Sequence, residues 1–111
     1  MDLFAGMRVS DLDRAKQWYT RLLGKEPAFY PNEREAVWEL AEHRYLYIES
    51  GRGRQGDGLV TVFVEDLDAV VDGAAARGVE PAEQETYGNG VRKTTYRDSD
   101  GNEVGFGGAP V

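Results

Sequence analysis

The chain contains no cysteine and a single histidine among its 111 residues. Without cysteine, disulfides and thiolate metal sites are excluded. No apolar run approaches the roughly 20 residues that span a bilayer, and the start, MDLFAGMRVSDLD, lacks the basic and apolar segments of a secretory signal. We therefore expect a cytoplasmic protein that is not inserted in a membrane.

Basic residues are also comparatively few, with 13 Lys and Arg against 20 Asp and Glu and a formal net charge of −7. Nucleic-acid binding depends on cations that neutralise phosphates, and anionic membranes attract basic segments, so neither is an expected partner. A negative chain attracts cationic ligands over long distances. The same charge also serves simply to keep a domain soluble.

The chain is long enough for a real core, since 41% of its residues are hydrophobic and 30% are charged. An internal repeat organises it. Residues 9–27 read VSDLDRAKQWYTRLLGKEP and residues 64–81 read VEDLDAVVDGAAARGVEP. Both begin Val-x-Asp-Leu-Asp and end Gly-x-x-Pro, which predicts two copies of one supersecondary unit.

Each copy predicts a strand that leads into a helix. Apolar residues recur at three- and four-residue spacing after each Asp-Leu-Asp, as on the buried face of a helix. Either Ser10 or Asp11 can cap the first helix, and the sequence does not decide between them. Gly24 and Gly78 suit the left-handed position after a helix.

Three short strands are expected after each helix, separated by turn residues such as Gly88-Asn89-Gly90 and Asp98-Ser99-Asp100-Gly101-Asn102. This gives one domain over 1–111, with module one at about 1–50, a linker at about 50–58 and module two at about 58–111. The expected strands cover 27–31, 34–40, 44–49, 80–87, 90–97 and 102–107.

Three segments together, RVSDLDRAKQWYTRLLG, FVEDLDAVVDGAAARGV and RDSDGNEVGF, resemble the vicinal oxygen chelate superfamily. That superfamily includes glyoxalase I, extradiol dioxygenases, fosfomycin-resistance enzymes and bleomycin-resistance proteins. The resemblance implies an α+β fold in which paired βαβββ modules form an incomplete barrel around a cavity. It also implies a homodimer, often with two sites.

The resemblance implies metal ligands on the first, fourth, fifth and eighth strands in the metal-dependent members. Matched on the Asp-Leu-Asp starts and on Gly101, these positions fall on Phe4, Leu59 and Gly105, with Tyr47 as the fourth-strand position. These residues are poor divalent-metal ligands, so we expect no metal and no cofactor. The other open reading is a hard cation held by Glu49 and Glu103.

Strand alternation predicts which residues face the cavity. The expected lining is aromatic with a few charges, and it comprises Phe4, Arg8, Tyr45, Tyr47, Leu59, Phe63 and Gly105, with Trp38 as a possible addition. Such surfaces bind small organic molecules. Each aromatic residue could equally pack in the core or in a dimer, and Arg8 could form a cross-strand pair with Glu49. Trp18 lies off the apolar helix stripe, as a rim or dimer contact, and His43 is expected at a surface turn.

Two functions follow. The first is a metal-free protein that binds a small aromatic or cationic organic molecule in a homodimer cavity, similar to the bleomycin-resistance members. The alternative is an enzyme of the superfamily (lyase, isomerase or dioxygenase-like) with nonstandard or no metal, in which Glu49 or Glu103 is the general base. The sequence has no credible phosphate-binding loop and no readable nucleophile–base pair.

Overall fold

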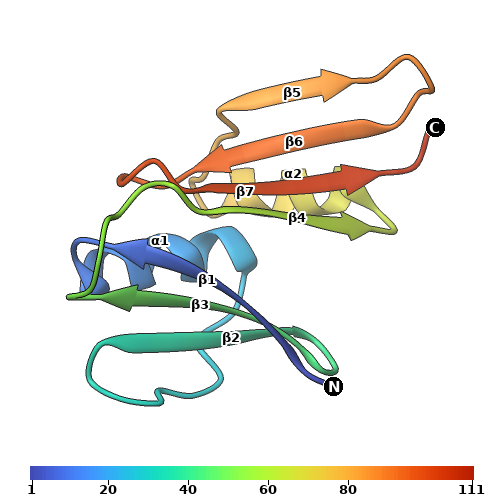
Figure 1. Cartoon of the computed structure of the whole chain (residues 1–111). Helices are drawn as coiled ribbons and strands as arrows, with labels where there is room; N and C mark the ends of the chain where they lie inside the picture. Colours follow the sequence, from blue (N-terminus) through green and yellow to red (C-terminus); the bar gives the residue numbers. More distant parts are fainter.

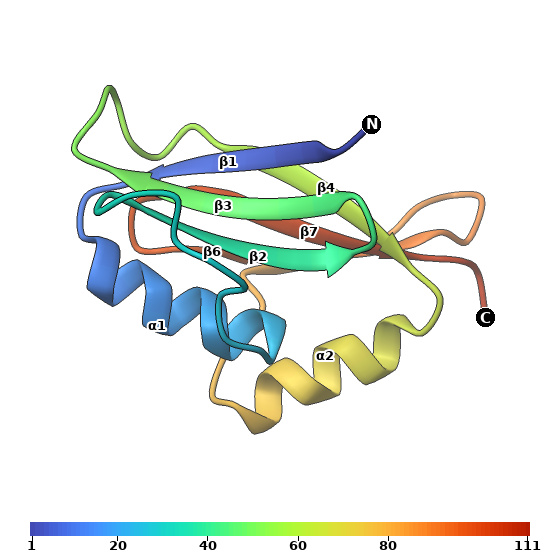
Figure 2. The same ribbon diagram turned by 90° about the horizontal axis from the view of Figure 1, so that it is seen from below.

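The computed structural model describes residues 1–111 as two β-sheets covered by two helices. Figure 1 shows one sheet above the other, and Figure 2 shows both helices on the same side of the sheets. The sheets have the orders β1-β3-β2 and β4-β7-β6-β5 and do not close into a barrel. The elements are β1 (Leu3–Val9), α1 (Leu12–Leu23), β2 (Glu35–Ala41), β3 (Arg44–Ser50), β4 (Leu59–Val64), α2 (Leu67–Ala76), β5 (Glu83–Thr86), β6 (Arg92–Arg97) and β7 (Glu103–Gly108).

The two sheets repeat one topology, as the internal repeat predicts. In each, the first strand runs parallel to the last, β1 with β3 and β4 with β7, and the remaining strands are antiparallel. β1 and β4 each have one hydrogen-bonded neighbour and are therefore edge strands of the two sheets. Residues of both strands line one cavity, and we call this junction of the two sheets the seam. Neither helix is long and apolar enough to cross a membrane.

The predicted strand at 27–31 is wrong. This segment makes only an isolated bridge between Phe29 and Val37. Pro27 and Pro31 stand at its two ends and have no N–H to donate to a ladder, which prevents regular pairing. The chain therefore has seven strands where eight were expected.

The helix ends follow the predicted capping chemistry. The side chain of Asp11 accepts a hydrogen bond from the backbone N–H of Arg14, so Asp11 and not Ser10 caps α1. Asp66 caps α2 in the same way. Gly24 and Gly78 adopt left-handed φ angles of 75° and 84°, which glycine tolerates without strain.

One hydrophobic cluster of 15 buried residues contains side chains from both modules. It fills the space between the sheets and the helices, where α1 packs on β2 and β3 and α2 packs on β7. The opposite face of each sheet carries no helix and is called the open face below. The largest fully buried side chains are Trp38, Tyr19, Tyr96, Met7, Leu22, Leu46 and Ile48.

The prediction that Trp38 could line the ligand cavity is corrected by its position in this core. Its ring lies 5.8 Å from that of Tyr19 on the helix side, and its indole N–H donates a 3.0 Å hydrogen bond to the carbonyl of Lys25. Ala36, Val37 and Trp38 are all buried, so residue character does not alternate along this part of β2 and does not reveal which face Trp38 occupies.

The turn at residues 98–102 joins distant parts of the chain. The Asp98 carboxylate accepts hydrogen bonds from the Tyr19 hydroxyl at 2.8 Å and from the Asn102 amide at 2.9 Å. The same amide group donates to the carbonyl of Arg8 at 2.8 Å, and the Asn102 side-chain oxygen accepts from the N–H of Gly58 at 2.8 Å. We call Asp98 and Asn102 the clasp, because they tie β1, α1 and the linker to the last hairpin.

Candidate functional site

The open face of the first sheet carries the residues that strand alternation predicted. The parallel register of β1 and β3 sets them beside each other in three pairs, because paired residues of neighbouring strands share a face. The pairs are Phe4 with Tyr45, Gly6 with Tyr47, and Arg8 with Glu49.

Three aromatic rings form the aromatic cluster, which consists of Phe4, Phe29 and Tyr45. Phe4 and Tyr45 are stacked, with ring centroids 4.5 Å apart and planes 12° apart. Phe29 meets Tyr45 edge-on at 6.3 Å. Phe4 is 45% exposed and Phe29 43% exposed, so the cluster presents aromatic surface to solvent and not only to the core.

Three carboxylates lie near the Tyr45 hydroxyl of the aromatic cluster. Loss of hydration raises the pKa of the Tyr45 hydroxyl, and the negative charges of Asp2, Glu39 and Glu42 raise this pKa further. These acidic groups come from the N-terminus, from β2 and from the turn before β3. These three carboxylates favour a positive charge near the Tyr45 hydroxyl.

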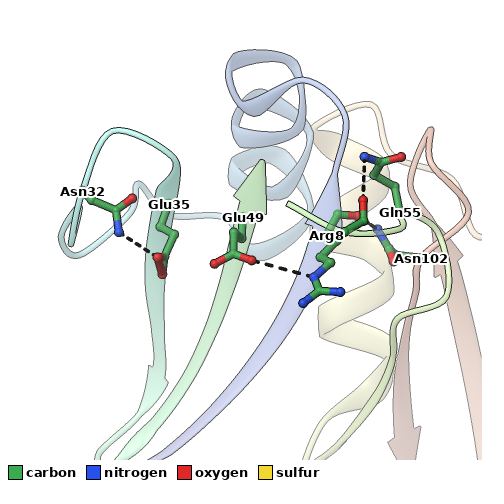
Figure 3. A network of polar contacts seen from close by, with 7 residues as sticks. Arg8, Asn32, Glu35, Glu49, Gln55 and Asn102 are labelled. Carbon is green, nitrogen blue, oxygen red and sulfur yellow. Dashed lines mark hydrogen bonds and ion pairs between the residues drawn. The ribbon is translucent and has the colours of Figure 1, made fainter. Parts of the chain in front are cut away.

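A cavity of about 340 Å³ lies where β1 and β3 of the first sheet meet the linker, and it shares no lining residue with the aromatic cluster. Tyr47 lies across Gly6, so that a side chain on Gly6 would collide with its ring. Arg8 and Glu49 meet at 3.8 Å over the cavity (Figure 3). The cavity is lined by Gly6, Met7, Arg8, Tyr47, Glu49, Arg54, Asp57, Gly58 and Asn102.

The open face of the second sheet has a different character. The Lys93 side chain covers Gly105, whose missing Cβ leaves the space it occupies. Glu103 is held by Arg97, whose Nη2 and Nε lie 2.6 and 3.0 Å from one carboxylate oxygen. Leu59 and Phe63 are 70% and 64% exposed.

A larger cavity of about 610 Å³ follows the seam between β1 and β4. It is mainly apolar and is lined by Leu3, Ala5, Leu40, Ala41, Arg44, Tyr45, Val60, Thr61, Val62, Phe63, Val64 and Glu65.

The residues predicted to line a single ligand cavity are divided between these two cavities. Arg8, Tyr47 and Glu49 line the smaller cavity and Tyr45 and Phe63 the larger one, whereas Phe4, Leu59 and Gly105 line neither.

Sequence reasoning missed several residues that contribute to these surfaces. Phe29 was assigned to a strand and not to the cluster. Arg54 and Asp57 were placed in a linker without a site, although they line the smaller cavity and pair with each other at 3.0 Å. Asn102 was read only as a turn residue. The sequence feature that could have indicated the role of Asn102 is its position directly after Gly101, where a side-chain amide can bind backbone groups of neighbouring segments.

The family of this chain follows from its match to a family model and to a solved structure. The family model of the Glyoxalase/Bleomycin resistance protein/Dioxygenase superfamily matches residues 3–106. The chain belongs to this superfamily. A solved glyoxalase/bleomycin resistance protein of this superfamily, from Catenulispora acidiphila DSM 44928, is 56% identical over 99% of each chain, with a TM-score of 0.94.

Solved structures of much lower sequence identity share the fold. The lactoylglutathione lyase from Agrobacterium tumefaciens is 19% identical, with a TM-score of 0.77 over 98% of this chain and 93% of that one. TioX from Micromonospora sp. ML1 is also 19% identical, with a TM-score of 0.79 over 96% and 97% of the two chains. A search of the curated proteins found no match.

The residues at the positions that resemblance to the superfamily assigns to a metal do not fit a divalent ion. Phe4, Leu59 and Gly105 offer no nitrogen or oxygen side-chain ligand, and Tyr47 offers only a phenol. No group of three or more His, Asp or Glu side chains that could hold a metal comes together in the chain. His43 lies at the turn between β2 and β3, with its ring nitrogens 2.6 Å from Asp2 and 3.2 Å from Glu42.

Proposed function

We propose that this chain is a metal-free binding protein that holds a small cationic aromatic molecule at the open face of the first sheet, as part of a homodimer. The observation that carries the proposal is the exposed Phe4–Tyr45 stack among carboxylates. A planar aromatic ligand gains contact area on such a surface, and a positive charge on it gains from both the ring faces and the acidic rim.

The side chains at the expected metal positions support binding without a metal. Phe4 and Tyr47 supply ring surface in place of metal ligands. Glu49 and Arg8 are the polar groups beside this surface, and a few such groups commonly fix a ligand's orientation in a mainly apolar site.

Exposed apolar side chains along the seam support a homodimer. Leu3, Leu59 and Phe63 are between 64% and 70% exposed, and Leu3 and Phe63 line the larger cavity. A second copy would remove these side chains from water and deepen the shallow open face into a cleft. Sedimentation velocity tests this part, and a monomer at micromolar concentration would contradict it.

Isothermal titration of a panel of cationic aromatic antibiotics, each with an uncharged aromatic analogue, tests the binding proposal. At least one cation should bind more tightly than its analogue. Tyr45→Ala should weaken that binding about tenfold, since an aromatic pair and a cation–π contact are each worth about 1 kcal/mol. Tyr87→Ala is the matched control, because Tyr87 is exposed but lies beyond β5. No heat from any compound at millimolar concentration would overturn the proposal.

A second candidate is an enzyme of the same superfamily in which Glu49 acts as general base in a lyase, isomerase or dioxygenase-like reaction. Glu49 favours it, because this carboxylate shares the smaller cavity with Tyr47 and Arg8. Glu103 is the weaker base of the two, since Arg97 already occupies one of its oxygens. A nonstandard metal would appear in elemental analysis of protein purified without chelator. Turnover that survives in Glu49→Gln would contradict the role of this residue.

A further inference from the structure

A third cavity lies away from both open faces, between α1 and the turn that follows β6. We propose that this arginine cavity binds a small aromatic anion, in which a phosphate or carboxylate is attached to a planar ring. The inference is independent of the proposed function, which concerns the opposite charge and other residues. The cavity has a volume of about 460 Å³ and is lined by Arg14, Ala15, Gln17, Trp18, Arg21, Arg97, Asp98 and Ser99.

The helix side of the cavity is one continuous stripe of α1. Arg14, Gln17, Trp18 and Arg21 stand at positions i, i+3, i+4 and i+7, which lie on the same face of a helix. This stripe is distinct from the core stripe, whose buried members are Ala15, Tyr19 and Leu22. Trp18 falls outside the apolar pattern of the helix because it belongs to this cavity stripe, which runs beside the core stripe.

The guanidinium groups of Arg14 and Arg21 have no ion pair and no side-chain hydrogen bond within the chain, although carboxylates outnumber cations overall. Asp98 also lines the cavity and keeps its negative charge, but it forms no ion pair with either guanidinium group. Its oxygens instead accept hydrogen bonds from Tyr19, from the Asn102 side chain and from two backbone N–H groups. Arg97 binds Glu103 through Nε and Nη2 and retains Nη1.

Arg14 stands where helix electrostatics do not favour a cation. It belongs to the first turn of α1, at the positive end of the helix dipole, where acidic residues are stabilising. The Asp11 carboxylate three residues earlier is engaged by the backbone N–H of Arg14 as the helix cap. An anion in the cavity would offset this unfavourable placement, and it would also meet Arg21 on the same stripe.

Trp18 gives the cavity its preference for an aromatic ligand. It is half-buried, and its indole N–H donates no hydrogen bond within the chain. A planar ring can stack on an indole or on a guanidinium group, and arginine binds phosphate and carboxylate oxygens with two parallel hydrogen bonds. The volume lies within the usual range for small-molecule sites, about 300–1,000 Å³.

The experiment titrates the full chain with adenosine monophosphate, benzoate and inorganic phosphate, followed by calorimetry and by tryptophan fluorescence. The double variant Arg14→Gln, Arg21→Gln removes two positive charges from the cavity. Its matched control, Arg34→Gln with Arg52→Gln, removes the same charge at the linker, where the exposed Arg34 side chain lies beside Gly51 and outside the cavities described above. Because Trp38 is fully buried, a fluorescence change that disappears in Trp18→Phe reports on the cavity.

We expect the nucleotide or benzoate to bind more tightly than inorganic phosphate and to bind less tightly as salt increases. The cavity variant should weaken binding at least tenfold, since a hydrogen bond to a charged group is worth about 1.5–3 kcal/mol. The linker variant and Tyr45→Ala should bind as the wild type does. Equal weakening in cavity and linker variants, no binding at millimolar concentration of any probe, or phosphate binding as tightly as both aromatic anions would overturn the proposal.

Discussion

The two modules share one topology but differ on their open faces. At matching register positions, module one has Gly6 beside Tyr47 and module two has Thr61 beside Gly105. The neighbouring pair is Phe4 with Tyr45 in module one, where two rings stack, and Leu59 with Glu103 in module two. The helix-facing residues of both modules belong to one core. Packing therefore preserves the repeat on one side of the sheets, while the open sides have diverged.

The largest expected change in stability comes from removing the clasp, whose hydrogen bonds join the two modules. Asn102→Ala should lower the free energy of unfolding by about 3 kcal/mol, because it leaves the Asp98 carboxylate and the backbone groups of Arg8 and Gly58 without this partner in a buried site. Urea denaturation measures the change. Asn89→Ala is the control, since its side chain makes a single bond in an exposed turn, and an equal loss in both variants would refute the special role of the clasp.

The next largest change in stability distinguishes the two open faces through a glycine-to-alanine substitution on each. Gly6→Ala forces the Tyr47 ring aside and should cost about 1–2 kcal/mol, as overpacking does. In Gly105→Ala the new methyl group is crowded by the flexible end of Lys93 and meets the Thr61 hydroxyl at 3.4 Å, an ordinary contact. The loss of glycine's freedom in the unfolded chain offsets the crowding. Its unfolding free energy should stay within about 0.5 kcal/mol of the wild type. Thermal denaturation of the two variants in parallel measures both changes. If Gly105→Ala proved less stable than Gly6→Ala, the packing described for the two faces would be contradicted.

A smaller effect distinguishes the two helices, because Tyr19 in α1 stands at the repeat position of Ala74 in α2. Burial and the neighbouring Asp98 raise the pKa of the Tyr19 hydroxyl above its ordinary value. The unfolded chain therefore loses this proton first as pH rises above about 10, so stability is retained below that pH and decreases above it. Tyr19→Phe should cost about 1 kcal/mol at neutral pH and reduce the alkaline loss, as followed by urea denaturation at increasing pH. An unchanged alkaline slope would assign the loss to other tyrosines.

The smallest effect concerns the ion pairs of the two open faces. Arg8 and Glu49 are 3.8 Å apart and Arg8 is half-exposed, so Glu49→Gln should change the free energy of unfolding by less than about 0.5 kcal/mol. Glu103→Gln should cost somewhat more, up to about 1 kcal/mol, because Arg97 approaches its carboxylate to 2.6 Å. Both are measured by urea denaturation at low and high salt. A loss above 2 kcal/mol for Glu49→Gln would indicate a buried charge that this geometry does not contain.

The repeat could be predicted from the recurrence of one motif along the chain. The glycine that ends each helix and the open-face residues of β1, β3, β4 and β7 could be predicted because each depends on local spacing, as at Gly24 and around Tyr45. The sequence narrows the cap of α1 to Ser10 or Asp11, and the structure assigns it to Asp11. Trp38 could not be assigned, because β2 is buried at three successive positions. The division of the predicted lining between two cavities depends on how the sheets meet at the seam, and no local pattern in the sequence encodes that.

The clasp also has a consequence for synthesis of the chain. Module one occupies the first half of the sequence, yet the carbonyl of Arg8 and the hydroxyl of Tyr19 find their partners only in residues 98–102. A ribosome releases the N-terminal half first, so that half must wait for the last hairpin before these groups are satisfied. Once complete, backbone amides near both ends of the sequence should exchange with deuterium as one cooperative unit.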